Sequence, residues 1–475
     1  MLLAQSAPRG DPRRGDKLLD SCGACGRCSR SGRLTCLRPR RPHLDALDRR
    51  IVTLALPALG ALLVEPLYNL TDSAIVGHLG RAPLGALAIA GGALTVVWWT
   101  AAFIEMATVT LVAQRRGAGD SEAAMRDVGA AYVLSIGLGA LCALLIVALA
   151  VPIADVLGAR GLIARDAVEY LRISAVGMVP LVMSFAGTGH LNGLSNTRRP
   201  FEIALVANGI NVALEIVLVY VVHLGIAGSA WGTVAAQLSS AVLFAVSSLR
   251  ASMRPARPRP ADLARLARDG VPLTIRTVAL GLALLSSTAV AARLGAAVLA
   301  GHQIALQIWL LLALALDALA VPAQVFVGAA IGTFDRQQAT AVGRRTLRLG
   351  LAIGIGLGLL TVALAGVLPQ VFTSDGSVRH QATLALLLCG LQQPIAALAF
   401  VLDGLLLGAS EYGTLRTAML VALVAFVPLA ALTLRLHSLG IVGVWLALTC
   451  WLTVRTGVLL ARWHGGRWGP AALAP

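Results

Sequence analysis

Long apolar runs separated by short polar segments dominate the chain. About 20 consecutive apolar residues are enough to cross the hydrocarbon core of a bilayer as a helix. Twelve such runs follow one another at residues 51–78, 86–113, 128–151, 171–193, 201–222, 226–249, 271–292, 298–330, 345–368, 381–408, 417–436 and 440–461. The pattern therefore predicts an all-α polytopic membrane protein with twelve transmembrane helices. The run 298–330 is long enough for a tilted or a broken helix.

The two halves of the chain repeat each other with an offset of 215 residues. Six spans per half would start and end each repeat on the same side of the membrane. We therefore expect two pseudo-symmetric six-helix bundles, related by an axis along the membrane normal, that alternate access by rocking against each other. The matched pairs that are not merely apolar include Pro57/Pro272, Gly80/Gly295, Gly117/Gly332 and Asp120/Asp335.

Composition supports this class and charge gives it an orientation. The 475 residues are 57% hydrophobic and 13% charged, whereas a soluble globular protein has about 25% charged residues. Apart from residues 1–50, eighteen basic residues fall in or beside the loops on the side of the termini and seven on the other side. The positive-inside rule then places both termini in the cytoplasm. The net charge of +16 indicates contact with anionic lipids and not with nucleic acid.

The same features divide the chain into segments. We predict a disordered, basic, cysteine-containing cytoplasmic extension at 1–48, bundles at 49–250 and 270–465, a linker at 251–269 and a cytoplasmic tail at 466–475. The extension has no apolar h-region and so is not a secretory signal. Its four cysteines could in principle bind zinc or an iron–sulfur cluster, but their spacing matches no complete zinc module. They are Cys22, Cys25, Cys28 and Cys36, and we predict no metal site or cofactor.

Polar residues that are costly at membrane depth gather in the first half. Glu65 and Asp72 lie seven residues apart on nearly one face of the first helix, and Pro66 beside them is a candidate hinge. The fifth helix carries Asn211 and Glu215, and the sixth carries Thr233. Two carboxyl groups placed close together can share one exchangeable proton. Alternatively, these oxygens could hold Na⁺, or each acid could serve packing alone.

The second half carries Arg276, Asp317 and Asp403 within its spans. A compensated cluster of arginine and aspartate is tolerated where a lone charge is not. Arg276 could also extend along lipid to the interface. We leave open whether this cluster is a structural gate or contacts substrate or protons directly.

Five segments resemble the multidrug and toxic compound extrusion (MATE) family, the last four its DinF branch. They are LALPALGALLVEPLYNLTDSAIVGHLG (54–80), AQRRGAGD (113–120), NGINVALEIVLVY (208–220), LALDALAVPAQ (314–324) and VLDGLLLGASEY (401–412). The resemblance covers about residues 45–465 in the family's order. It implies twelve helices in two bundles that form a V, and export of drugs or metabolites driven by inward flow of H⁺ or Na⁺.

The resemblance also suggests roles for single residues. It implies a protonatable carboxyl at Asp72, with a polar network at Glu65, Asn211, Glu215 and Thr233, although Glu65 replaces a familiar Gln and Glu215 a familiar Asp. The NorM type of the family carries acidic cation ligands in its second half. Here the corresponding stretches around Leu280 and Ala396 are apolar, which favours H⁺ over Na⁺. DinF-like members share Arg276, Asp317 and Asp403.

We therefore expect a bacterial inner-membrane antiporter, a multi-pass monomer that exports amphipathic or cationic small molecules in exchange for H⁺, with Na⁺ less favoured. The alternative is a lipid-linked precursor flippase of the wider superfamily, which a strongly positive cavity would favour. An intramembrane enzyme is disfavoured because the eight histidines are dispersed and show no HExxH spacing. A P-loop for ATP is also absent from the sequence.

Overall fold

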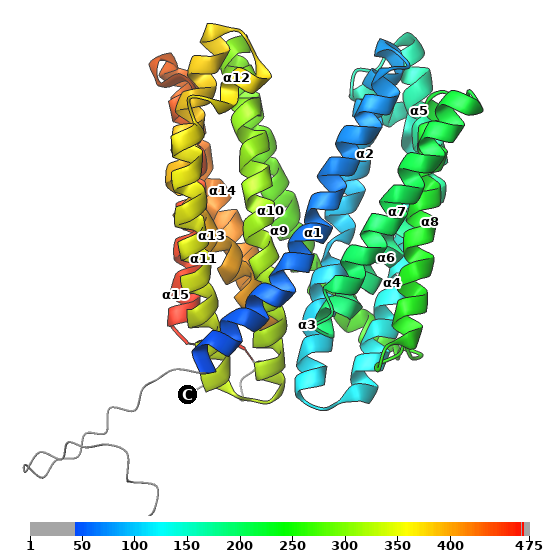
Figure 1. Ribbon diagram of the computed structural model, residues 1–475, viewed down its shortest axis with the longest axis vertical. Coiled ribbons are helices and arrows are strands. Elements are labelled where there is room, and N and C mark those ends of the chain that lie inside the picture. Colours follow the sequence, from blue (N-terminus) through cyan, green and yellow to red (C-terminus); the bar gives the residue numbers. More distant parts are fainter. Residues whose placement is uncertain (1–42, 467, 470–475) are drawn as a thin grey trace, which may run out of the picture. The chain divides into compact units, whose positions relative to one another are not determined.

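Helices make up nearly all of the computed structural model, which describes residues 43–466, 468 and 469 (Figure 1). The predicted extension lies outside the described residues as far as residue 42, its four cysteines included, and so do Arg467 and residues 470–475 of the predicted tail. The first half contains α1 (His43–Gly77), α2 (Arg81–Ala101), α3 (Phe103–Gly117), α4 (Ser121–Val156), α5 (Gly161–Val176), α6 (Met178–Gly193), α7 (Arg198–Ile216), a π-helical turn (Val217–Val221) and α8 (Ile226–Arg250).

The second half repeats this order after the segment 251–259. It contains α9 (Pro260–Leu294), α10 (Ala296–Gly332), α11 (Arg336–Leu364), α12 (Leu368–Phe372), α13 (Gly376–Gly408), α14 (Tyr412–Arg435), a 3₁₀ turn (His437–Leu439) and α15 (Gly440–His464). Figure 1 shows α2–α8 and α9–α15 as two groups of helices.

The predicted spans are confirmed within the described residues. Eleven helices are long and apolar enough to cross a membrane, and the pair α5–α6, bent by 51°, completes twelve if it counts as one span. The run 298–330, which left a broken helix open, lies within the single helix α10. Most of the helices carry exposed large apolar side chains, as lipid-facing helices do; Leu144 is 66% exposed and Leu359 is 67% exposed.

The repeat is visible in backbone geometry as well as in sequence. Gly80 and Gly295 precede α2 and α10 with φ of 122° and 126°, a region that only glycine adopts readily. Asp120 and Asp335 cap α4 and α11, and their carboxylates accept hydrogen bonds from the backbone N–H groups of the matched residues Ala123 and Gln338 at 3.0 and 2.8 Å. Residues 195 and 410, both serine, have φ of 62° and 58°. The offset of 215 therefore describes structurally equivalent positions.

The halves differ where one helix is broken and its counterpart is continuous. The first half interrupts its second span at Ala102 and its fourth at Gly177, while α10 and α13 run without a break. At Gly177 a β-carbon would lie 1.8 Å from Oε1 of Gln237, so α8 approaches the break closely. The bend between α5 and α6 thus follows from a close helix contact that only glycine permits.

The described residues from Asp45 onward form one compact unit with three large apolar clusters. One cluster belongs to the first half and includes Tyr170 and Met178, and another belongs to the second half and includes Trp445 and Trp451. The largest cluster combines residues of both halves, from Phe103 on α3 to α10, α13 and α15. The two halves therefore share a core in one region and have separate cores elsewhere.

Candidate functional site

Asp72 is a buried carboxyl group on α1 that contacts α8. The side chain is 6% exposed, and its Oδ1 accepts a hydrogen bond from Oγ of Ser229 at 2.7 Å. Ser229 is itself fully buried in the first turn of α8. A hydrogen bond to a carboxylate is among the stronger ones in proteins, so Ser229 fixes the orientation of the Asp72 carboxyl group.

Glu215 on α7 lies beside this pair. It is fully buried, and neither of its carboxyl oxygens has a hydrogen-bond partner among the described residues. Its main electrostatic partner is Asp72, and Ser229 is also within reach. A β-carbon at Gly232 would lie 3.3 Å from the Glu215 backbone nitrogen, so the glycine lets α8 approach α7 at this point. The structure thus brings two carboxyl groups together, away from water.

A second polar group extends from this pair along α1. The hydroxyl groups of Tyr68 and Thr233 lie 2.9 Å apart, and the Asn211 side-chain nitrogen lies 3.4 Å from each of them. The Asn211 side-chain oxygen is buried without a partner among the described residues. The buried ring of Tyr170 packs against the same cluster and interacts with Asp72 and Glu215. Asp72, Asn211, Glu215 and Thr233, which the sequence grouped together, therefore do form one cluster.

Glu65 is placed differently. Its side chain is exposed, and its carboxylate would repel that of Glu105 on α3. The two acids on α1 thus face different surroundings despite their spacing of seven residues. Pro66 lies inside α1, which remains helical from residue 43 to residue 77, so its role as a hinge stays a prediction.

The second half contains a buried ion cluster that joins three helices. Asp403 on α13 accepts from both Arg276 on α9 and Arg455 on α15, and all three residues are buried. Arg455 is 2% exposed and stacks on the rings of Phe400 and Trp451, at 5.7 and 5.6 Å from the ring centroids. These contacts explain why two guanidinium groups tolerate full burial.

Asp317 on α10 is the second acid beside the two arginines, and it forms no ion pair within 4 Å among the described residues. It interacts electrostatically with Arg276, Asp403 and Arg455, and it is only partly buried. On its other side it interacts with Glu105 of the first half. Arg276 also reaches across to the first half, where its Nη1 lies 3.8 Å from the sulfur of Met106. The cluster predicted from Arg276, Asp317 and Asp403 is therefore present and lies next to α3.

Sequence reasoning missed Ser229, Tyr68, Tyr170 and Arg455. The first three are ordinary residues in a transmembrane helix, and nothing in the sequence alone distinguishes them. Arg455 did carry a signal, because it is a single charge deep in the last predicted span, 440–461. Among the described residues, no group of three or more His, Cys, Asp or Glu is placed to hold a metal ion.

Comparison with known proteins places the chain in a family. The family model described as MatE matches twice, at residues 57–217 and 272–433, and the two matches begin 215 residues apart. The chain belongs to the MatE family. Its two matches correspond to the two six-helix bundles, and the protein is accordingly a membrane transporter of the MATE type.

Several curated relatives resemble this MatE protein over most of their length. Protein DETOXIFICATION 44, chloroplastic, of Arabidopsis thaliana is 29% identical over 88% of this chain and 82% of its own. DNA damage-inducible protein F of Escherichia coli is 27% identical over 89% and 94%, respectively. The resemblance to the DinF branch is consistent with this relative. A probable multidrug resistance protein NorM of Thermotoga maritima is 22% identical over 90% and 94%.

Solved structures confirm the fold. A MATE transporter of Vibrio cholerae matches with a TM-score of 0.85 at 19% identity, over 91% of this chain and 99% of the other. A structure described as MATE in the bent conformation matches with a TM-score of 0.83 at 21% identity, over 89% and 97%. The MatE protein thus has the two-bundle fold of these transporters.

Proposed function

We propose that the protein exports amphipathic, cationic small molecules in exchange for H⁺. The observation that carries this proposal is the buried pair of Asp72 and Glu215. Two carboxyl groups side by side and away from water cannot both be charged without a counter-cation. The pair is therefore suited to take up one proton in one state of the transporter and release it in another.

Coupling would act through α1. Asp72 on α1 contacts α8 through Ser229, and Tyr68 on α1 contacts α8 through Thr233. A change in the protonation of Asp72 alters the hydrogen bond with Ser229 and with it the packing of α1 against α8. Pro66 lies between the middle of α1 and Tyr68, where a missing backbone N–H makes bending easier. Movement of this helix would link proton binding to access between the two halves.

Na⁺ is the second candidate for the coupling ion. Hard cations prefer oxygen ligands. Both carboxyl oxygens of Glu215 and the side-chain oxygen of Asn211 lack hydrogen-bond partners among the described residues, and Asp72 is adjacent. We favour H⁺ because the second half has an apolar sequence where the NorM type carries acidic cation ligands, but the oxygens near Glu215 make Na⁺ worth testing directly.

The charges midway along the helices favour a cationic substrate. Glu105 lies within electrostatic range of both Glu65 and Asp317. All three residues are acidic and incompletely buried. The two arginines buried within the helices of the second half, Arg276 and Arg455, are both paired with Asp403. A flippase for phosphate-bearing lipids would need the opposite sign, so this arrangement argues against that alternative. The charge asymmetry of the loops supports insertion in a bacterial inner membrane with both termini in the cytoplasm.

The experiment is dye export from proteoliposomes under one imposed gradient at a time. With an ethidium-like cation inside, a pH gradient should drive export and an equal Na⁺ gradient should not. Asp72→Asn and Glu215→Gln should each reduce gradient-driven export at least tenfold, while Asp155→Asn, which removes an exposed carboxylate at the end of α4, should leave it unchanged. Full export by Asp72→Asn would refute the proposal.

A further inference from the structure

The two halves meet through a pseudo-symmetric contact, in which equivalent residues of α3 and α10 face each other. At the end of α3, a β-carbon on Gly117 would lie 2.1 Å from the carbonyl oxygen of Ala329 on α10. At the end of α10, a β-carbon on Gly332 would lie 2.0 Å from the carbonyl oxygen of Gln114 on α3. The offset of 215 converts Gly117 into Gly332 and Gln114 into Ala329. The two contacts are therefore equivalent, as in an isologous dimer interface.

Polar contacts extend this interface to α13. Oγ1 of Thr110 donates to the carbonyl oxygen of Leu407 at 2.9 Å, and the side-chain nitrogen of Gln114 donates to that of Gly408 at 2.8 Å. The side-chain nitrogen of Gln324 donates to the carbonyl oxygen of Met106 at 2.7 Å. This is also where the largest apolar cluster joins the two halves. The halves are thus tightly closed at the ends of α3 and α10.

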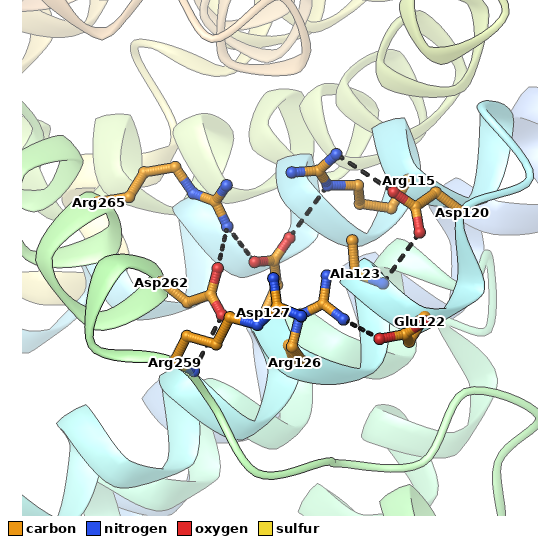
Figure 2. Close-up of polar contacts among 9 residues, drawn as sticks. All are labelled: Arg115, Asp120, Glu122, Ala123, Arg126, Asp127, Arg259, Asp262 and Arg265. Carbon is orange, nitrogen blue, oxygen red and sulfur yellow. Dashed lines mark hydrogen bonds and ion pairs between the residues drawn. The ribbon is translucent and has the colours of Figure 1, made fainter.

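The first helix of the second half reaches across to the first half beside this contact. Arg265 on α9 pairs with Asp127 on α4, which is 2% exposed and also accepts from Nε of Arg115 at 3.3 Å (Figure 2). Asp262, one turn earlier on α9, lies 3.8 Å from Nε of Arg126 on α4. Figure 2 shows these side chains converging between the start of α9 and the start of α4.

The first helix of the first half, α1, reaches in turn across to the second half. Asp48 on α1 forms a two-pronged pair with Arg345 on α11 of the second half. Arg50 lies over the ring of Phe326 on α10, at 5.5 Å from its centroid. The repeat matches Arg50 to Arg265 and α11 to α4. Each half therefore extends the start of its first helix onto the third span of the other half.

We propose that these features form one reciprocal latch that closes the membrane side on which α1 begins and α15 ends. The glycine crossing of α3 and α10 is its centre, and the pairs Asp127–Arg265 and Asp48–Arg345 are its two arms. Both arms bridge the same two bodies, so a rigid rocking motion must break both of them together. Releasing either arm therefore raises the open population, and releasing both multiplies the two effects. This inference rests on the alternating-access part of the proposed function and not on the identity of the coupling ion.

Double electron–electron resonance measures the distance between two spin labels and so reports directly whether the latch is open. The labels replace Ser121 on α4 and Gln337 on α11, two exposed residues on opposite sides of the latch, in a chain whose seven native cysteines are changed to serine. The unmodified latch should give one short distance in lipid nanodiscs. Asp48→Arg and Arg265→Gln should each raise the longer-distance population at least threefold, and together about ninefold.

Matched variants separate the latch from general damage. The exchange Asp48→Arg with Arg345→Asp should restore the short distance, because the charges again attract. Gly117→Ala should open the latch, whereas Gly356→Ala on α11, where a β-carbon meets nothing within 4 Å, should not. Arg198→Gln, which removes a pair within α7 alone, should also have no effect.

Two outcomes would overturn the latch: distances that do not respond to Asp48→Arg and Arg265→Gln, or a charge exchange that fails to restore closure. The coupling proposal fails separately. If Asp72→Asn retains gradient-driven export while the label distances still respond to the arm variants, the coupling site is refuted and the latch stands.

Discussion

The buried charge cluster of the second half makes a strong prediction about stability. Asp403→Ala removes the carboxylate that both Arg276 and Arg455 share, and leaves two residues at 8% and 2% exposure without the counter-charge that contacts them directly. Removing one partner of a buried pair typically costs about 3–5 kcal/mol. The compact unit has about 430 residues. At an unfolding entropy of about 2.1 cal/mol/K per residue, a loss of this size lowers the Tm by roughly 3–6 °C. We expect a shift of that order.

The assay is thermal unfolding in detergent, followed by the loss of the monodisperse peak in size-exclusion chromatography. The control Asp155→Ala breaks an exposed pair with Arg160 and should change the free energy of unfolding by less than about 1 kcal/mol. The triple variant Arg276→Met, Asp403→Leu, Arg455→Met should recover most of the stability, because apolar side chains can replace a buried ion cluster. An Asp403→Ala protein as stable as Asp155→Ala would refute the assignment of an essential counter-charge.

Three further predictions concern single contacts. Ser229→Ala removes the hydrogen bond to Asp72 and should slow gradient-driven dye export severalfold, while Ser229→Thr should retain more activity. Equal export rates for both variants and the native protein would contradict this. Gly295→Ala places a side chain at φ 126° and should destabilise the protein by about 1–3 kcal/mol in thermal unfolding, whereas Gly356→Ala should be neutral or stabilising. Asp335→Ala removes the cap of α11 and should cost about 1 kcal/mol by the same measurement, an expectation that an unchanged Tm would exclude.

The architecture could be predicted from the sequence because it depends on length and periodicity. Apolar runs of bilayer length define the spans, and glycine and aspartate at matched positions define the repeat. Gly80 and Gly295 illustrate this well, since their positive φ angles are a backbone requirement that leaves its mark in the sequence. The breaks at Ala102 and Gly177 could not be predicted, because they depend on contacts with other helices that the local sequence does not encode.

The candidate site could be predicted only in part. Charged residues at membrane depth are conspicuous, so Asp72, Glu215 and Asp403 could be named in advance. Ser229 could not, because a serine in a membrane helix becomes significant only when its partner is known. The exposure of Glu65 also depends on packing, since a spacing of seven residues leaves neighbouring helices to decide what each side chain contacts.

The central claim is that protonation of the pair Asp72 and Glu215 drives export. The most direct test starts with equal dye concentrations inside and outside proteoliposomes. It then measures the pH change in the lumen while dye is exported. The native protein should move protons in the direction opposite to the dye, in amounts proportional to the dye exported. Glu215→Gln and Asp72→Asn should abolish both fluxes together. Dye export without any proton movement, or with proton movement that survives Asp72→Asn, would contradict the account.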